Sequence, residues 1–315
     1  GTSAMAIEPV WDGTDLVGLA VASGEATVAF VPFDRLAALQ PALADASVPK
    51  VLHDAKPLLR ALFEADVDFN GLAFDTALAG YVINPAERAP DLHDLTGSVL
   101  GVEIEPASPD SDGGGAQGAF DFEGSGPDLE AAGRRALAVS RLVDPLTDQL
   151  DARGGLRLLR EVELPLVRVL AKMEEAGIGT DRDYLVELGE TLRDRLTTLE
   201  KKIYEAAGDP FNINSTLQLR EVLFDRLGLP ILKKTPKGAP STDASVLQKL
   251  VEEHPVVEHL LGYRELEKLR STYVDGLLPL IGDDGRIHCV FNQTGAATGR
   301  ISSCLLYTSD AADDN

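Results

Sequence analysis

Apolar and small or polar residues alternate in two short runs near the start of the chain, at residues 16–22 and 26–31. The turn-forming residues Ser23-Gly24-Glu25 separate the runs. Two alternating runs joined by a short loop that contains glycine predict a β-hairpin. A further strand is expected at residues 4–8, so the pattern predicts three strands before the first helix.

Helical and extended patterns alternate beyond the hairpin. The expected elements are a helix at 34–45, a strand at 49–52, a helix at 57–64, a strand at 72–74 and a helix with Asp75 as its N-cap. The order β-β-β-α-β-α-β-α predicts a mixed sheet flanked by helices, which is an α/β architecture.

The stretch at about 103–127 breaks this regular pattern. It contains Pro-Asp-Ser-Asp-Gly-Gly-Gly and few large apolar residues, so it lacks the apolar surface needed to offset the entropy of ordering. We expect a disordered loop there, followed by a helix from Asp128 to about Leu150. Gly154-Gly155 predicts the end of a first domain that spans residues 1–150.

The second half of the chain, 151–303, has mostly helical periodicity. A narrow apolar seam with spacings of three and four residues predicts a helix of about seven turns that starts at Asp181 and pairs with another helix. The seam consists of Leu185, Leu188, Leu192, Leu196, Leu199, Ile203 and Ala206. Shorter helices are expected from 214 or 215 to 228, from Thr242, and at 256–280, and alternation from Arg286 predicts a strand.

Charge and composition limit the classes of protein that remain. The formal net charge is −22, yet residues 1–159 hold 10 Lys/Arg against 25 Asp/Glu, whereas residues 160–303 hold 19 against 23. The acidity is therefore concentrated in the first half, and the second half can still bind nucleic acid through local basic groups. No run of about 18 apolar residues predicts a membrane span. Two cysteines cannot form a disulfide framework, which favours a reducing cytoplasm.

One loop of the second half is rich in groups that bind phosphate. Ammonium groups, hydroxyls and a glycine lie directly before a predicted helix N-terminus, where backbone N–H groups are free to bind anions. The residues are Lys233, Lys234, Thr235, Lys237, Gly238, Ser241 and Thr242. A solvated, lysine-bearing turn explains the same residues, and the loop alone does not decide between the two interpretations.

Two further polar groups follow helical spacing. Arg264, Lys268 and Thr272 recur at i, i+4 and i+8 and so share a face of the predicted helix at 256–280, although ion pairs with neighbouring glutamates explain them equally well. A second cluster, of which capping alone would explain two members, lies at a helix start. It consists of Asn212, Asn214, Ser215 and Gln218.

Six strings in residues 163–303 carry a family resemblance. They are ELPLV at 163–167, FNINST at 211–216, LKKTPKGAPST at 232–242, YREL at 263–266, KLRSTY at 268–273, and GRIH at 285–288 leading to ATGRISS at 297–303. In this order they resemble the thumb and the beginning of the palm of A-family DNA polymerases of the bacterial polymerase I type. The resemblance implies that the lysine loop is the thumb tip and that Arg264 and Lys268 meet the duplex backbone. It also implies that Arg300 reaches the minor groove near the primer terminus.

The same resemblance places the chemistry of nucleotidyl transfer beyond these strings. Two carboxylates that hold two Mg²⁺ ions, and a helix that binds the incoming triphosphate, are expected only in the full-length polymerase. We therefore assign no catalytic residue, no metal ligand and no cofactor to this chain. Primer-template DNA is the expected partner, and dNTPs are partners only of the full-length protein, which is expected to be a monomer.

The first half resembles the 3′-5′ exonuclease domain of these polymerases, a DnaQ-type, ribonuclease H-like fold. The strings LVGL at 16–19 and FDTAL at 74–78 carry the resemblance. Alignment with the family's four metal-binding acids puts Ala6 and Glu8 in the first motif, Leu58 in the second and Val139 in the third. One carboxylate of four cannot hold two metal ions, so the resemblance implies an inactive domain. The family also carries Asp75, which is explained more simply as a helix cap.

The preferred interpretation is a piece of a DNA-directed DNA polymerase that acts in replication and repair in the bacterial cytoplasm, associated with the nucleoid. The runner-up is a 3′-5′ exonuclease of the DnaQ or RNase D type. A third is an acidic, non-catalytic interaction protein. Residues 304–315 resemble a translated sequencing adaptor, so we expect a non-native tail after Ser303.

Overall fold

The computed structural model describes residues 4–24, 27–86, 90–105 and 128–303 of the chain. Most of the expected disordered loop at about 103–127 and the tail at 304–315 lie outside these residues. The chain divides into two compact units. Unit 1 comprises the described residues up to Gly177 together with those from Cys289 to Ser303, and unit 2 comprises residues 178–288.

Unit 1 is built on a five-stranded mixed sheet, as the sequence predicts. Its strands are β1 (Met5–Asp12), β2 (Asp15–Ser23), β3 (Thr27–Pro32), β4 (Lys50–Leu52) and β5 (Leu72–Asp75), in the order β3-β2-β1-β4-β5. The first three strands pair antiparallel, and β4 lies parallel to both β1 and β5. The α/β class of this unit is confirmed.

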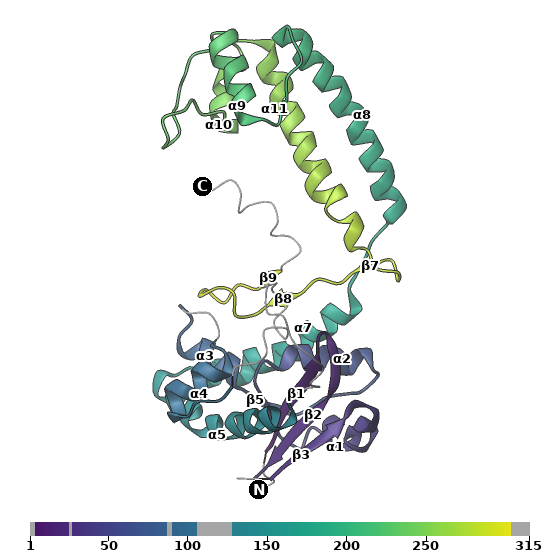
Figure 1. The fold of residues 1–315 in the computed structure, drawn as a ribbon, viewed down its shortest axis with the longest axis vertical. Coiled ribbons are helices and arrows are strands. Elements are labelled where there is room, and N and C mark those ends of the chain that lie inside the picture. Colours follow the sequence, from purple (N-terminus) through teal and green to yellow (C-terminus); the bar gives the residue numbers. More distant parts are fainter. Residues whose placement is uncertain (1–3, 25–26, 87–89, 106–127, 304–315) are drawn as a thin grey trace. The chain divides into compact units, whose positions relative to one another are not determined.

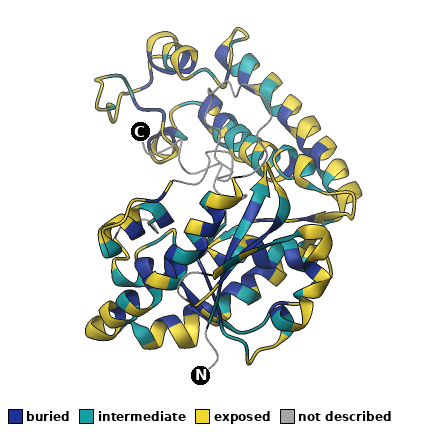
Figure 2. Ribbon diagram, turned by 60° about the horizontal axis from the view of Figure 1, so that its bottom comes forward, coloured by how far each residue is buried: buried dark blue, intermediate teal, exposed yellow. Residues whose placement is uncertain are grey.

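The helices of unit 1 cover the sheet and contribute most of its core. They are α1 (Gln40–Ala44), α2 (Ala55–Glu64), α3 (Thr76–Ile83), α4 (Leu92–Leu100) and α5 (Leu129–Arg153). The single helix predicted at 34–45 is wrong, because a 3-10 helix at Phe33–Ala38 precedes α1 and Pro41 stands in the first turn of α1. On α5, Ala136, Val139, Leu142, Leu146 and Leu150 are all buried, and Figure 2 shows buried residues on the helices and strands of this unit.

The chain remains in unit 1 well beyond the glycines at 154 and 155. Gly154 ends α5 in the left-handed conformation, with φ of 71°. The chain continues through α6 (Leu156–Leu158), the π-helical segment η3 (Leu159–Glu163) and α7 (Leu164–Ala176). The division between the units falls at Gly177, which also has a positive φ, of 61°.

The strand predicted from Arg286 is split between the two units. Arg286–Ile287 forms β7, which pairs with β6 (Ile178–Gly179) in unit 2, and Phe291–Asn292 forms β8, which pairs with β9 (Ser302–Ser303) in unit 1. The alternation itself is present, since Ile287 and Cys289 are buried and their neighbours at 288 and 290 are exposed.

Unit 2 is mainly helical and contains a long antiparallel helix pair, α8 (Arg182–Ala207) and α11 (Pro255–Lys268). The Asp181 side chain caps α8 by accepting a hydrogen bond from the Tyr184 amide at 2.9 Å. Each of the seven residues of the predicted seam is buried or half-buried, which confirms the pairing. The π-helical segment η6 (Leu269–Asp275) and the 3-10 turn η7 (Leu278–Leu280) extend α11.

Short helices close one end of unit 2 around a second core. They are α9 (Thr216–Arg220), the π-helical η4 (Glu221–Arg226), α10 (Ala244–Leu247) and the 3-10 turn η5 (Gln248–Leu250). Ile203 of α8 and Leu260 of α11 are fully buried here with Leu219, Leu223 and Leu247. The helix expected to start at Thr242 starts at Ala244 instead, with Asp243 as the N-cap residue.

A membrane-spanning helix, long and apolar enough to cross a bilayer, does not occur among the described residues.

Candidate nucleic-acid interface

The lysine loop of unit 2, residues 233–242, is an ordered hairpin. Lys234 and Pro240 form an antiparallel bridge, and the Ser241 amide donates to the Lys233 carbonyl at 2.9 Å. The Thr235 amide donates to the Ala239 carbonyl at 2.8 Å, and Gly238 supplies the positive φ, 82°, that this tight turn requires. The backbone of the loop thus closes upon itself through its own hydrogen bonds.

The three lysines of this loop, Lys233, Lys234 and Lys237, are exposed. The Lys233 ammonium lies 3.5 Å from a carboxylate oxygen of Asp243, and both side chains are more than half exposed. An ion pair in such a position contributes little to stability and exchanges readily for another anion. The loop therefore presents three cationic groups on a fixed backbone, which suits a repeating phosphate chain.

Ser241 and Thr242 are positioned differently from the lysines. Both are buried, with Ser241 only 1% exposed. The Ser241 hydroxyl accepts from the Asp243 amide at 3.3 Å, and the Thr242 carbonyl accepts from the Arg264 guanidinium at 2.5 Å. In the structure these two residues anchor the loop to α10 and α11, and Arg264 is the side chain that holds Thr242.

Lys268 and Thr272, the other two residues of the predicted helical face, lie in different helical segments. Lys268 is exposed on the last turn of α11, whereas Thr272 is half-buried within the π-helical segment η6. A π-helix has a wider turn than an α-helix, so the i, i+4 relation does not extend unchanged from Lys268 to Thr272. The structure keeps Arg264 and Lys268 on one helix and sets Thr272 in a separate segment.

The polar cluster at the start of α9 is a closed local network. Asn212 accepts from the Asn214 amide at 3.0 Å, and Gln218 accepts from the Asn212 amide at 2.7 Å. Ser215 is the N-cap and accepts from the Gln218 amide at 3.5 Å. Ser215 is thus the cap of α9, and the side chains of Asn212 and Gln218 hold the loop that leads into the helix.

Arg300 belongs to unit 1, in the loop between β8 and β9. It is exposed and directly follows a turn in which the Gly299 amide donates to the Ala296 carbonyl at 3.1 Å. Gly299 has φ of 74°, a conformation that favours glycine. The turn determines where the Arg300 backbone leaves the loop.

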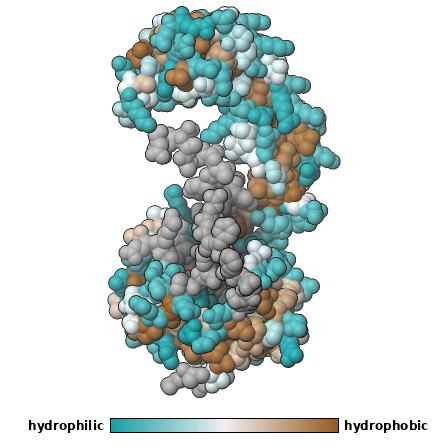
Figure 3. Space-filling model, viewed as in Figure 1, coloured by the Kyte–Doolittle hydropathy of each residue, from teal (hydrophilic) through white to brown (hydrophobic). Residues whose placement is uncertain are grey.

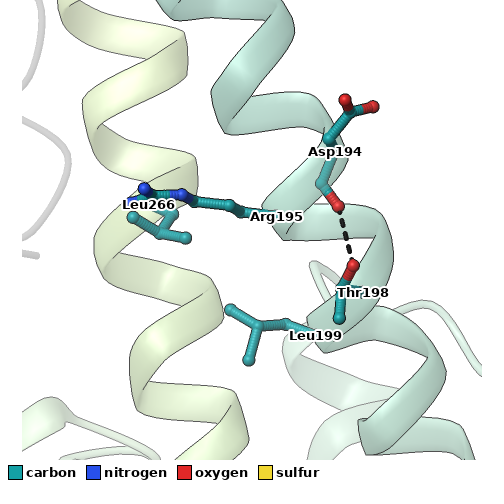
Figure 4. Close-up of a pocket in the computed structure, with 5 residues that line it drawn as sticks. All are labelled: Asp194, Arg195, Thr198, Leu199 and Leu266. Carbon is teal, nitrogen blue, oxygen red and sulfur yellow. Dashed lines mark hydrogen bonds between the residues drawn. The ribbon is translucent and has the colours of Figure 1, made fainter.

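A shallow groove lies between α8 and α11, lined by Asp194, Arg195, Thr198, Leu199 and Leu266. Figure 4 shows Arg195 extending from α8 toward Leu266, while the Thr198 hydroxyl donates to the Asp194 carbonyl at 3.0 Å. Hydrophobic residues also reach the surface of this helix pair, nearer the start of α8 (Figure 3). The groove has no set of converging polar groups that would do chemistry.

The positions aligned with the exonuclease acids lie inside unit 1. Ala6, Leu58 and Val139 are fully buried. The Glu8 carboxylate is also buried, and it forms an ion pair with Arg135 of α5 at 2.5 Å. Burial raises the pKa of Glu8, and the Arg135 charge and hydrogen bond oppose this rise. The sequence analysis did not identify Arg135 as the partner of Glu8. The available indication was an acidic residue on a strand expected to be buried, because a buried carboxylate requires a cation beside it.

Two neighbouring groups complete this region. Asp75 is buried and accepts from four backbone amides, those of Asp54, Ala55, Ala77 and Leu78, so its role as the cap of α3 is seen directly. The ring of His53 lies 2.8 Å from the Thr76 hydroxyl. Burial, together with the Arg135 charge, lowers the pKa of His53 to about 4, so the ring is neutral at neutral pH.

The residues do not fit a two-metal centre. A group of three or more His, Cys, Asp or Glu side chains that could hold a metal ion is absent from the part of the chain that the structure describes. At the aligned exonuclease positions the single carboxylate, that of Glu8, already has a guanidinium as its counterion.

Fold and surface together define a protein class: a ribonuclease H-like domain joined to a helical unit that presents a basic hairpin. Family models agree with each part. The model described as DNA polymerase I, ribonuclease H-like domain, matches residues 11–103, and the model described as DNA polymerase family A matches residues 182–305. Each part of the chain is thus similar to a part of the family A polymerases of the DNA polymerase I type.

Individual relatives show the same similarity. The chain is 40% identical over 257 residues to DNA polymerase I of Bacillus subtilis, covering 81% of this chain and 28% of that protein. It is 38% identical over 308 residues to DNA polymerase I of Geobacillus stearothermophilus, covering 96% and 35%. The solved POL domain of Pol1 from M. smegmatis, in complex with DNA primer-template and dNTP, matches with a TM-score of 0.80 and 35% identity, covering 96% of this chain and 51% of that one. The chain thus spans about a third of the length of these curated relatives.

Proposed function

We propose that this chain is part of a DNA-directed DNA polymerase that acts in replication and repair, and that unit 2 binds primer-template DNA as the polymerase thumb. The exposed lysines of the hairpin at 233–242 are the observation that carries the proposal. Their ammonium groups project from a closed backbone, and duplex DNA offers a regular row of phosphates to such groups. The solved M. smegmatis relative, by its description, binds primer-template DNA.

The predicted DNA contacts divide into two roles in this proposal. Lys233, Lys234, Lys237, Lys268 and Arg300 are exposed and contact DNA directly. Arg264 and the buried Ser241 and Thr242 hold the hairpin, because their polar groups already bind one another or the backbone. The network at the start of α9 supports the backbone beside them.

We further propose that the chain itself neither polymerises nor degrades DNA. Mg²⁺ and dNTPs belong to the full-length polymerase in this proposal, since the described residues of this chain offer no carboxylate cluster for the metal. The full-length protein is proposed to be a cytoplasmic, nucleoid-associated monomer. Primer extension by this chain with dNTPs and Mg²⁺ would refute the claim that the chain does not polymerise DNA. Metal-dependent digestion of single-stranded DNA that Glu8→Ala abolishes would favour an exonuclease instead.

A salt titration of DNA binding tests the thumb assignment. Primer-template affinity should fall as salt rises, and the triple variant Lys233→Ala, Lys234→Ala, Lys237→Ala should reduce the slope of log K against log[salt] by about 2 to 3, because each lost phosphate contact removes about 0.9. The charge-matched control removes three exposed lysines of the same unit outside the loop, Lys201, Lys202 and Lys249. Equal slopes for the two triple variants would refute the hairpin as the DNA contact, and no affinity at low salt would favour an acidic interaction protein.

A further inference from the structure

The ribonuclease H-like domain has an attachment to the loop that carries Arg300. The Tyr81 hydroxyl, from α3 of that domain, donates to the Ala296 carbonyl at 2.7 Å. Ala296 also accepts the Gly299 amide that closes the turn, at 3.1 Å. Tyr81 is only 4% exposed. Its hydroxyl therefore sits in the turn that immediately precedes Arg300.

Two buried carboxylates hold the beginning of the same segment. Glu174 of α7 accepts from the Phe291 amide at 2.8 Å and is paired with Lys56 of α2. Gln293 is buried and donates to both the carbonyl and the carboxylate of Glu163. The segment is thus bound at 291, 293 and 296, and all the partners belong to unit 1.

The hydrogen bond from Tyr81 is suited to holding the turn before Arg300 in place. Burial and the nearby Glu163 carboxylate raise the pKa of Tyr81, so its hydroxyl remains a donor at neutral pH. A buried hydrogen bond that loses its donor leaves an unsatisfied carbonyl, which is costly. Residues 296–299 hence have one favoured position relative to α3, and Arg300 starts from that position.

We propose that Tyr81 is a positioning residue for Arg300, so that the ribonuclease H-like domain, without nuclease chemistry, orients a side chain that contacts the primer terminus. The DNA half of this inference rests on the proposed function. The attachment of the turn to Tyr81 does not depend on the proposed function. Separate experiments test the attachment and its effect on DNA binding.

Amide hydrogen exchange without DNA tests the attachment. Tyr81→Phe removes only the hydroxyl, and the Gly299 and Arg300 amides should then exchange about five to ten times faster, because a local opening loses one hydrogen bond. Tyr204→Phe is the matched control, since its hydroxyl donates to Glu200 at 2.6 Å in unit 2. Unchanged exchange at 299 and 300, or an equal change across unit 1, would overturn the positioning role.

A double-mutant cycle on DNA binding tests the consequence. Arg300→Ala should weaken binding to a recessed primer-template at least threefold in the parent chain and less than twofold in Tyr81→Phe, because contacting residues couple. Binding to blunt duplex of the same length should change less than twofold in either background. Penalties that simply multiply would overturn the inference. Absence of DNA binding in the parent chain would overturn the proposed function and the DNA half with it, whereas the exchange result would still decide whether Tyr81 holds the turn.

Discussion

Glu8, Leu58 and Val139 in unit 1 are nearly excluded from solvent, whereas Lys233, Lys234 and Lys237 in unit 2 are exposed. Both sets stand where a family resemblance places polar groups that meet nucleic acid or metal. In unit 1 two of these positions are now part of the hydrophobic core. The comparison teaches that positions aligned with a metal site can be filled by side chains that pack into the core, whereas the lysines of the loop remain accessible to a partner.

Leu58→Asp should have the largest effect of the changes considered. Leu58 is fully buried on α2, so the substitution both empties apolar volume and buries a carboxylate without a cation. We expect the free energy of unfolding to fall by more than about 4 kcal/mol, with no gain of nuclease activity. Urea denaturation measures the loss, and Leu58→Met, which conserves volume, should cost less than about 1.5 kcal/mol. A stable Leu58→Asp protein would show that this position has remained a polar site.

Arg135→Met should be the next most damaging change. It removes the counterion of Glu8, and breaking a buried ion pair from one side costs about 3 kcal/mol or more. Adding Glu8→Gln to this variant should restore a large part of the loss, because the uncompensated charge is then gone. If the double variant is no more stable than Arg135→Met alone, the packing of the Arg135 side chain, and not the ion pair, stabilises this region.

His53 makes the stability of unit 1 dependent on pH. Its pKa is lowered from 6.5 to about 4, so the folded state binds this proton less tightly than the unfolded chain. We expect the stabilisation to be complete above about pH 6.5 and to be lost as the pH falls toward 4, by no more than about 3 kcal/mol. The raised pKa of Glu8 acts in the opposite direction, so the measurement is the difference between the parent chain and His53→Gln in urea unfolding between pH 7 and 5. His259→Gln, in unit 2, is the control, and parallel curves for all three proteins would exclude His53 as the cause.

Much of the fold was predictable because local patterns and tertiary packing agree. The hairpin of β2 and β3, the cap at Asp75 and the paired seam of α8 follow from alternation, capping chemistry and spacing. The break between residues 38 and 40 was missed because the apolar pattern runs through it, and the early end of the strand at 286–287 was missed because alternation persists to residue 293. Periodicity records which side of the chain is buried, and it does not record where backbone hydrogen bonds change partner.

The candidate site was predictable only in part, for a related reason. Exposed lysines in a glycine-containing loop can be found from the sequence. The neighbouring Ser241 and Thr242 have the same polar character in the sequence, yet both are buried, and Arg264, 22 residues further on from Thr242, binds that threonine. The contact between Tyr81 and Ala296 spans 215 residues, and no local pattern indicates it. Roles that depend on a distant partner have no signature within a short window of sequence.

The smallest effect on stability is expected where the chemistry is most exposed. The triple lysine-to-alanine variant of the hairpin should change the free energy of unfolding of unit 2 by less than about 1 kcal/mol, because the ion pair between Lys233 and Asp243 is exposed on both sides. The backbone bridge between Lys234 and Pro240 needs no lysine side chain. Urea denaturation of this variant beside the DNA titration separates the two properties: a hairpin that serves only binding loses affinity and keeps its stability. A fall of several kcal/mol in the free energy of unfolding would show that the lysines stabilise unit 2. The contrast with the buried positions of unit 1 would then be wrong.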